Sequence, residues 1–371
     1  MRPFLMSRKS AVPHELHKNV DEIFAVGGNL GNLMFLSSME RIVPHEQSCH
    51  RATFNPNTIK EQADIIVIPA ANWLAESRDL GDLANRIEMS GLPCVVFGLG
   101  AQSLEAKKLK LRPGTERFLK VISERSHSIS VRGDFTAEVI ASCGIDNITV
   151  TGCPSLLWHL DRSAEIVRRE THRDPVKTIL SITPPGKLNP NINNFRTQLS
   201  RKLCQFGFEN NFPIVLQTEI ELMKAAKGEV SLDDKETRKV LDFFWGGLSS
   251  TDVDRYVTNN LRLFGNPTDW MVFSSNHDLV LGTRLHGVIA SLLSGTPAVL
   301  IGHDTRTLEM SRQAGIPMIK AEDIIKNDIS PQNILEEADF DHFNKRQKSY
   351  FNDFIDFFET NKVPHKLKRI Q

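Results

Sequence analysis

Short apolar runs alternate with amphipathic stretches along most of this chain. Such runs are typical of buried parallel strands, and the stretches between them have the three- and four-residue periodicity of helices. Strands are predicted at residues 21–27, 63–70, 93–100, 127–132, 148–152, 178–182, 213–218, 270–274, 278–281, 298–301 and near 318–319. Helices are predicted at residues 32–41, 80–90, 115–124, 134–143, 195–206, 235–244, 251–263, 285–293 and 308–314. This alternation predicts an α/β fold with mostly parallel sheets.

The alternation breaks between residues 160 and 177, where Arg, Glu and His are frequent and apolar residues are scarce. We expect this segment to link two domains, and a chain of 371 residues also favours two domains of ordinary size. One βαβ domain is predicted over residues 1–165 and a second over 175–330, facing each other across a cleft. Phenylalanines recur at helical steps in residues 331–371, which predicts a helical tail packed on the body.

Charge and cysteine content argue against several classes of function. The 45 Lys and Arg residues balance 45 Asp and Glu residues, whereas a broad nucleic-acid surface needs excess positive charge. The five cysteines are dispersed and form no CxxC pair, so we expect reduced thiols in a cytoplasmic protein. The first residues do not resemble a secretory signal, and no apolar run has the length of a membrane span. Peripheral association with a membrane assembly is compatible with this pattern.

The strongest candidate chemistry follows one predicted strand of the second domain. An apolar run ends in Gly282 and Thr283, after which Arg284 and His286 open a buried helix. Such a turn lies at the carboxyl edge of a parallel sheet, where α/β proteins bind ligands. Arg284 can hold a phosphate or carboxylate there, and His286 can move a proton near neutral pH. Alternatively, Arg284 pairs with a carboxylate and His286 is a core residue, although only Asp278 is acidic nearby in the sequence.

Arg132 gives the first domain a similar strand end. The predicted strand at 127–132 stops at this residue, and a helix that Asp134 is expected to cap follows it. Two arginines, one from each domain, suit a dianionic ligand in the cleft between the domains. An arginine solvated at a domain edge is the alternative interpretation.

Two more strand ends in the first domain carry candidate binding residues. Gly28 and Asn29 lie in a Gly-rich turn before a helix, and such a turn lets the backbone approach a phosphate or a sugar closely. Gln102 and Ser103 follow the strand predicted at 93–100 and are candidates for hydrogen bonds to sugar hydroxyls. Ordinary tight turns would explain all four residues equally well.

The loop after residues 298–301 contains His303, a candidate for contact with an acceptor, and Arg306, which would add positive charge. A polar loop with a helix cap is the alternative. The 12 histidines are dispersed without a metal-ligand spacing, so no metal site is predicted. The patterns of a Walker loop and of a dinucleotide-binding turn are also missing, which argues against ATP and NAD.

The order of these motifs resembles that of the polysaccharide pyruvyl transferases, over roughly residues 21 to 320. The segments that carry the resemblance are residues 63–68, 97–103, 129–132, 150–155, 282–287 and 295–299. The sequence departs from the family pattern in two places. Pro-Ala-Ala-Asn-Trp stands at residues 69–73, where the family usually has a glycine-rich run, and Gly133 separates Arg132 from Asp134.

The resemblance implies two Rossmann-like domains in a GT-B-like arrangement with an interdomain cleft. It also implies transfer of a pyruvyl group from phosphoenolpyruvate to two hydroxyls of a sugar residue, forming a cyclic ketal during synthesis of exopolysaccharide or another cell-surface glycan. Arg284 and Arg132 would bind the phosphate and the carboxylate. His286 would protonate carbon or accept a hydroxyl proton. The implied partners are phosphoenolpyruvate and a sugar acceptor, free, lipid-linked or polymeric, with no metal or organic cofactor.

Two other functions fit the same residues. A GT-B glycosyltransferase that uses a nucleotide sugar would share the fold, the cleft and an arginine that binds phosphate. A non-catalytic glycan-binding subunit would bind its ligand without releasing phosphate, and the departure at residues 69–73 keeps this alternative open.

Overall fold

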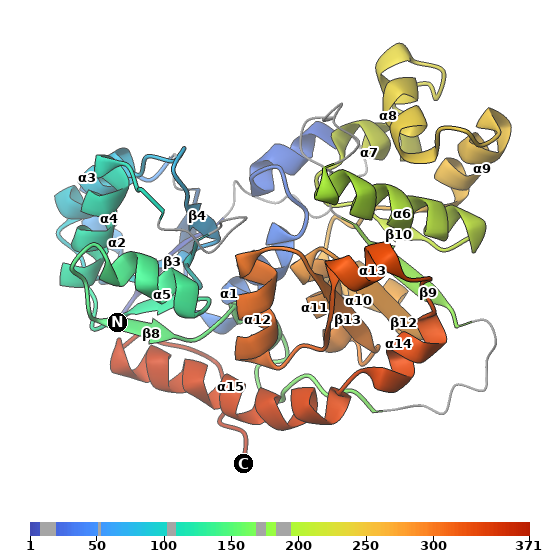
Figure 1. The fold of residues 1–371 in the computed structure, drawn as a ribbon. Coiled ribbons are helices and arrows are strands. Elements are labelled where there is room, and N and C mark those ends of the chain that lie inside the picture. Colours follow the sequence, from blue (N-terminus) through green and yellow to red (C-terminus); the bar gives the residue numbers. More distant parts are fainter. Residues whose placement is uncertain (8–19, 51–52, 102–108, 168–175, 183–193) are drawn as a thin grey trace.

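A computed structural model describes residues 1–7, 20–50, 53–101, 109–167, 176–182 and 194–371. It contains two parallel sheets, each with helices around it (Figure 1). In the first sheet the strand order is β2 (Gln47–Cys49), β1 (Pro3–Met6), β3 (Ile65–Pro69) and β5 (Cys94–Phe97). The parallel pair β7 (Ile129–Val131) and β8 (Ile148–Val150) continues this sheet, because Leu99 forms a bridge to Val131. The residues that follow β3 and β5 along the chain form a short parallel pair, β4 (Asn72–Leu74) and β6 (Gly100–Ala101).

The second sheet has the strand order β11 (Leu261–Arg262), β10 (Ile214–Val215), β9 (Thr178–Ser181), β12 (Leu279–Gly282), β13 (Ala298–Gly302) and β14 (Met318–Lys320). All of its pairings are parallel. Counted along the chain, this is the 3-2-1-4-5-6 order of a Rossmann sheet. The order reverses between β9 and β12, so loops diverge there and leave a crevice at the carboxyl ends of the two strands.

Helices cover both sheets. Those of the first half are α2 (Pro56–Gln62), α3 (Gly81–Ser90), α4 (Pro113–Glu124) and α5 (Asp134–Ala141). Those of the second half are α6 (Phe195–Glu209), α7 (Ile220–Ala226), α8 (Lys235–Trp245), α9 (Ser250–Asn260), α10 (Pro267–Ser275), α11 (Leu285–Leu293), α12 (Thr305–Ala314) and α13 (Ala321–Lys326).

The long helix α15 (Phe340–Thr360) follows α14 (Pro331–Glu337) and runs beneath both halves (Figure 1). Phe357 and Phe358 pack on Phe97 of β5, with ring centroids 5.0 and 4.4 Å away. Its Gln347 side chain donates to the carbonyl of Ala314 at the end of α12. The tail therefore fastens the first sheet to the second.

Helix α1 (Asn32–Ile42) also joins the two halves, since it contacts β3 as well as α10 and α11. One buried apolar cluster accordingly contains Val67 and Phe97 from the first sheet together with Val280 and Leu300 from the second. Alternate residues of β3 face the opposite side of the first sheet, where a second cluster lies.

Two of the predicted strands are helices. Residues 21–27 fall in the 3-10 helix η2 (Val20–Val26), whose buried residues Val20, Ile23 and Val26 are spaced three apart, as the period of that helix requires. Residues 270–274 lie in α10, where Asn266 caps the amide of Asp269 and Pro267 opens the first turn. The first sheet also contains the inner strand β1 and the edge strand β2, which the periodicity of the sequence did not predict.

Asp134 is not the cap of its helix. It is the first residue of α5, and Gly133 occupies the cap position without a side chain to offer. Glu309 of α12 accepts hydrogen bonds from the amide and the hydroxyl of Thr136 instead, at 2.9 and 3.3 Å. A Cβ on Gly133 would approach Glu309 to 2.6 Å, so the glycine that interrupts the family motif makes room for this contact between halves.

The predicted fold class is confirmed: the protein is α/β, with two Rossmann-like parallel sheets in a GT-B-like arrangement.

Candidate functional site

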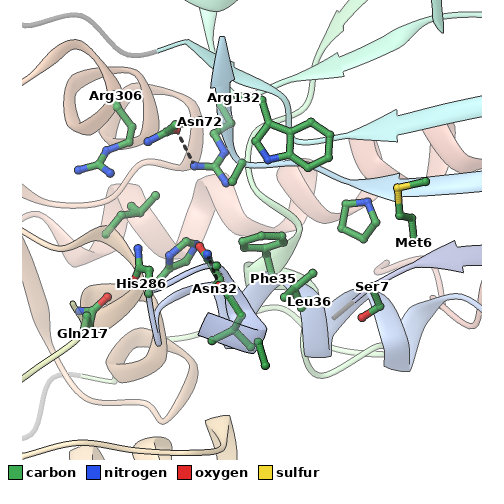
Figure 2. A pocket seen from close by; sticks show the side chains of 18 of the residues that line it. Met6, Ser7, Asn32, Phe35, Leu36, Asn72, Arg132, Gln217, His286 and Arg306 are labelled. Atoms are coloured by element: carbon green, nitrogen blue, oxygen red, sulfur yellow. Dashed lines mark hydrogen bonds between the residues drawn. The ribbon is translucent and has the colours of Figure 1, made fainter. Parts of the chain in front are cut away.

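A pocket of about 250 Å³ lies between the two halves, at the carboxyl edges of both sheets (Figure 2). From the first sheet it is lined by Met6 and Pro69, the last residues of β1 and β3. From the second it is lined by Gln217, which follows β10, and by Arg284 and His286, which follow β12. Met6 and Pro69 end the two strands, β1 and β3, between which the order of the first sheet reverses. Arg284 and His286 follow β12, which lies at the corresponding point of the second sheet.

Arg284 occupies the cap position of α11 and is largely buried. Its guanidinium donates to Glu219 at 2.7 Å and to the hydroxyl of Thr218. The carboxylate partner considered in the sequence analysis therefore exists, but it is Glu219 and not Asp278, which accepts a hydrogen bond from the amide of Lys177. The buried Nε of Arg284 has no hydrogen-bond partner among the described residues, so the side chain is oriented by Glu219 and retains a donor.

Arg132 reaches the pocket from the end of β7, although only 2% of it is exposed. Its guanidinium donates to the carbonyl of Gly98 at 2.9 Å and to the side-chain oxygen of Asn72 at 3.1 Å (Figure 2). It also lies 6.0 Å from the ring of Phe35 on α1. These hydrogen-bond partners are neutral, so they fix the side chain and leave its positive charge uncompensated.

Arg306, in the first turn of α12, is the third arginine of the pocket (Figure 2). Asp304 caps this helix through the amide of Thr307 and lies 3.5 Å from the guanidinium of Arg306. The Nε of Arg306 is buried and has no protein partner. From the sequence, Arg306 was only a source of added charge. What gives it a position in the site is the capping box at the start of its helix, Asp304 to Thr307.

His286, in the first turn of α11, is buried among these arginines. Its Nε2 lies 3.7 Å from the sulfur of Cys153, and its ring centroid lies 5.8 Å from that of Phe35. Burial lowers the pKa of His286 well below 6.5, and the charges of Arg132, Arg306 and Arg284 lower this pKa further. The imidazole is therefore neutral at pH 7 when no anion is bound.

Gly31 lies where the first half closely approaches Gln217 and His286. A Cβ on Gly31 would lie 2.4 Å from the side-chain oxygen of Gln217 and 3.1 Å from Nδ1 of His286. Leu30 donates its amide to the carbonyl of Gln217 at 2.8 Å. The Gly-rich turn thus brings the first half close to the catalytic candidate through Gly31, a residue the sequence analysis did not select.

Of the predicted binding residues in the Gly-rich turn, Asn29 lines the pocket and Gly28 does not. Gly28 has a φ of +73° and shapes the turn after η2. Gly282 and Thr283 also lie outside the pocket lining. Gly282 faces Ser181 and Val288, while the buried Thr283 donates its amide to the carbonyl of Ser181. Gly282 ends β12 and pairs with Ser181 of β9, and Thr283 directly precedes Arg284.

His303 is not among the pocket-lining residues. Its side chain is buried, with Nδ1 on the carbonyl of Ile301 and Nε2 3.7 Å from Asp304. Gln102 and Ser103 lie outside the residues that the structure describes.

Among the described residues, the lining of the pocket contains four arginines and two histidines and no Asp or Glu. Nowhere in the described ranges do three or more His, Cys, Asp or Glu side chains form a group that could hold a metal ion. Among the helices described, none has the length and apolar composition needed to cross a membrane. The site is thus a cationic pocket with one neutral imidazole, an arrangement that favours an anionic ligand.

Solved structures with a similar chain path include UDP-N-acetylglucosamine 2-epimerases from three organisms. The enzyme from Methanocaldococcus jannaschii, in complex with UDP-GlcNAc and UDP, has a TM-score of 0.48 and 9% identity, covering 96% of this chain and 100% of that one. The enzyme from Neisseria meningitidis, bound to UDP-GlcNAc, has a TM-score of 0.45 and 11% identity, with 94% of each chain covered. The enzyme from Rickettsia bellii has a TM-score of 0.44 and 12% identity, with 97% of each chain covered. No curated protein matches the sequence.

Two Rossmann-like sheets that share a cationic pocket define the class: an α/β protein with a candidate anion-binding site between its halves. The family model of the polysaccharide pyruvyl transferases matches residues 8–305. The chain therefore belongs to the polysaccharide pyruvyl transferase family, and the protein is a transferase.

Proposed function

We propose that the protein transfers the pyruvyl group of phosphoenolpyruvate to two hydroxyls of one sugar residue, in the synthesis of an exopolysaccharide or another cell-surface glycan. The observation that carries this proposal is the convergence of Arg132, Arg284 and Arg306 around His286, in a pocket whose described lining residues include no carboxylate. We call these four residues the donor end of the pocket. We place the reaction in the cytoplasm.

The donor end suits the two anionic groups of phosphoenolpyruvate. Planar guanidinium groups bind phosphate and carboxylate through paired hydrogen bonds. Arg284 and Arg132 take one anionic group each, and Arg306 adds a third positive charge where phosphate leaves. The unpaired Nε atoms of Arg284 and Arg306 are buried and gain partners when an anion binds. Arginine thereby neutralises the leaving phosphate, so the proposed reaction uses no metal or organic cofactor.

The reaction begins when a sugar hydroxyl adds to C2 of phosphoenolpyruvate while the terminal methylene carbon takes a proton. The C–O bond to phosphate then breaks, and the second hydroxyl adds to C2 and loses its proton, leaving a cyclic ketal and inorganic phosphate. Because the low pKa of His286 keeps its imidazole neutral, we assign His286 the role of base towards the attacking hydroxyl. The imidazolium formed in this step is stabilised by the bound anion.

The test compares His286→Ala and Arg284→Ala with His342→Ala and Arg312→Ala, which remove the same side chains from exposed positions on α15 and α12. Each variant is incubated with phosphoenolpyruvate and a panel of glycosides, and phosphate release and the mass of the ketal are measured. We expect the first two variants to lose at least about a hundredfold in rate and the controls to match the wild type. Near-wild-type ketal formation by His286→Ala and Arg284→Ala would overturn the proposal.

A further inference from the structure

The pocket has a fourth arginine that lies apart from the donor end. Arg78 lines the pocket from the first half, after strand β4. Arg132, Arg284 and Arg306 belong to the donor end, whereas Arg78 comes from the segment that follows β4. The donor end accounts for three of the four arginines in the described lining, so Arg78 is available to a second anionic group.

Two hydrogen bonds hold the backbone of Arg78 in place. Its carbonyl accepts a hydrogen bond of 2.8 Å from the buried hydroxyl of Thr115, at the start of α4. Its amide donates to the carbonyl of Ala75 at 3.0 Å. The partly exposed guanidinium forms no ion pair or hydrogen bond within the described parts of the chain. A cation without a partner, in a pocket whose described lining residues include no carboxylate, attracts an anion.

The residues before Arg78 belong to the same wall of the pocket. Asn72 and Trp73 of β4 line the pocket beside it. The ring of Trp73 packs on Phe118 of α4, with centroids 6.3 Å apart, and Asn72 accepts the hydrogen bond from Arg132. Trp73 and Arg78 therefore lie on one segment that packs against α4, and this segment offers an aromatic ring and a cation. It connects to the donor end through Asn72. We call residues 72–78 the acceptor wall.

We propose that the acceptor wall binds a sugar that carries an anionic group, with the sugar against Trp73 and the anion on Arg78. The proposal rests on the proposed function, because it takes the donor end to be filled by phosphoenolpyruvate. The anion is either the carboxylate of an acidic sugar or the phosphate through which a sugar is attached to its carrier. Both present oxygens that a guanidinium binds through two hydrogen bonds.

Binding without turnover tests this proposal, since an acceptor alone does not react. Titration calorimetry measures the affinity of three probes: methyl glucoside, which is neutral, methyl glucuronide, and glucose 1-phosphate. The proteins are the wild type, Arg78→Gln, and the control Lys120→Gln, which removes one positive charge from an exposed position on α4. Phosphoenolpyruvate is titrated into each protein as well.

We expect the wild type to bind one anionic probe at least about tenfold more tightly than methyl glucoside. Arg78→Gln should lose that preference and keep its affinity for phosphoenolpyruvate, and Lys120→Gln should behave as the wild type. A preference for the glucuronide identifies an acidic sugar, and a preference for glucose 1-phosphate identifies a carrier-linked phosphate.

Two results would overturn the inference: no preference of the wild type for an anionic probe, or an Arg78→Gln variant in which only phosphoenolpyruvate binding is weakened. Failure of the wild type to bind phosphoenolpyruvate would instead refute the proposed function. The sugar titrations would still show whether sugar binding depends on Arg78.

Discussion

Arg306 illustrates how one buried guanidinium completes the anion site. Asp304, 3.5 Å away, offsets part of the charge of Arg306. The Nε of Arg306 has no hydrogen-bond partner among the described residues. A bound phosphate would supply that missing acceptor, and hydrogen bonds to charged groups contribute about 1.5–3 kcal/mol. Under the proposed function, Arg306 therefore binds the donor together with Arg132 and Arg284.

Arg306→Ala should raise the KM for phosphoenolpyruvate by about tenfold or more, because each 1.4 kcal/mol of lost binding is about tenfold. Arg306→Lys should recover part of this loss, since lysine restores the charge without the planar pair of donors. Arg312→Ala, from an exposed position on the same helix, should leave KM unchanged. Steady-state kinetics with phosphoenolpyruvate as the varied substrate measures all three, and an unchanged KM for Arg306→Ala would contradict the assignment.

The charge state of His286 gives a second prediction for a single residue. A histidine accepts a proton only when its imidazole is neutral. Burial together with three arginines holds the pKa of His286 well below 6.5. As pH falls from 8, kcat/KM should therefore stay level through 6.5 and decline only at more acidic pH. Arg306→Gln removes one of the charges that lower this pKa, so the decline should move to higher pH in that variant. Profiles in which the two proteins decline at the same pH would show that His286 is not the titrating base.

At the scale of elements, α15 supports the segment that contacts His286, although the two are far apart in the sequence. The hydroxyl of Tyr350 accepts from the amide of Cys153 at 2.6 Å and donates to the carbonyl of the same residue at 2.9 Å. Cys153 in turn contacts His286 through its sulfur. Gly152, with a φ of +97°, allows this approach, because a Cβ there would lie 2.3 Å from the tyrosine hydroxyl.

Tyr350→Phe should therefore lower both stability and kcat. Loss of the hydroxyl leaves two buried backbone groups unpaired, at a cost of about 1–3 kcal/mol, and loosens the segment that contacts His286. Tyr256→Phe is the matched control, since its buried hydroxyl donates to the carbonyl of Phe212, a residue that does not line the pocket. Urea unfolding should show destabilisation of both variants, and assays should show a loss of kcat only for Tyr350→Phe. Equal kcat in the two variants would count against a positioning role for α15.

At the scale of the whole molecule, the two halves share one apolar cluster, joined by α1 and α15. Scanning calorimetry should therefore show one cooperative transition, with equal calorimetric and van't Hoff enthalpies. Phosphoenolpyruvate should raise the midpoint of that transition, because a ligand that binds only the native state stabilises it. UDP at the same concentration should raise it less. Two separate transitions would contradict a shared core, and a larger shift with UDP would favour the nucleotide-sugar alternative.

Two elements beside the candidate site were predicted correctly from nearly continuous apolar runs. The run before Gly282 forms β12, and the apolar stretch behind it forms α11, because both are buried on all sides and their residues are almost all apolar. The predictions failed for short or ambiguous runs: residues 21–27 form a 3-10 helix and residues 270–274 an α-helix. A five- to seven-residue apolar run fits strand and helix alike, so turn and cap residues have to distinguish them.

The sequence by itself determined the α/β class, the strand end that carries Arg284 and His286, and the likeness to the family that matches residues 8–305. These follow from local patterns, since periodicity and residue order are properties of short segments. Only the tertiary structure decided that Glu219, 65 residues away, pairs with Arg284, and that Arg132, Arg306 and Arg78 line the same pocket. Charge pairing, burial and the resulting pKa of His286 depend on distances through space, which chain folding sets and sequence spacing does not.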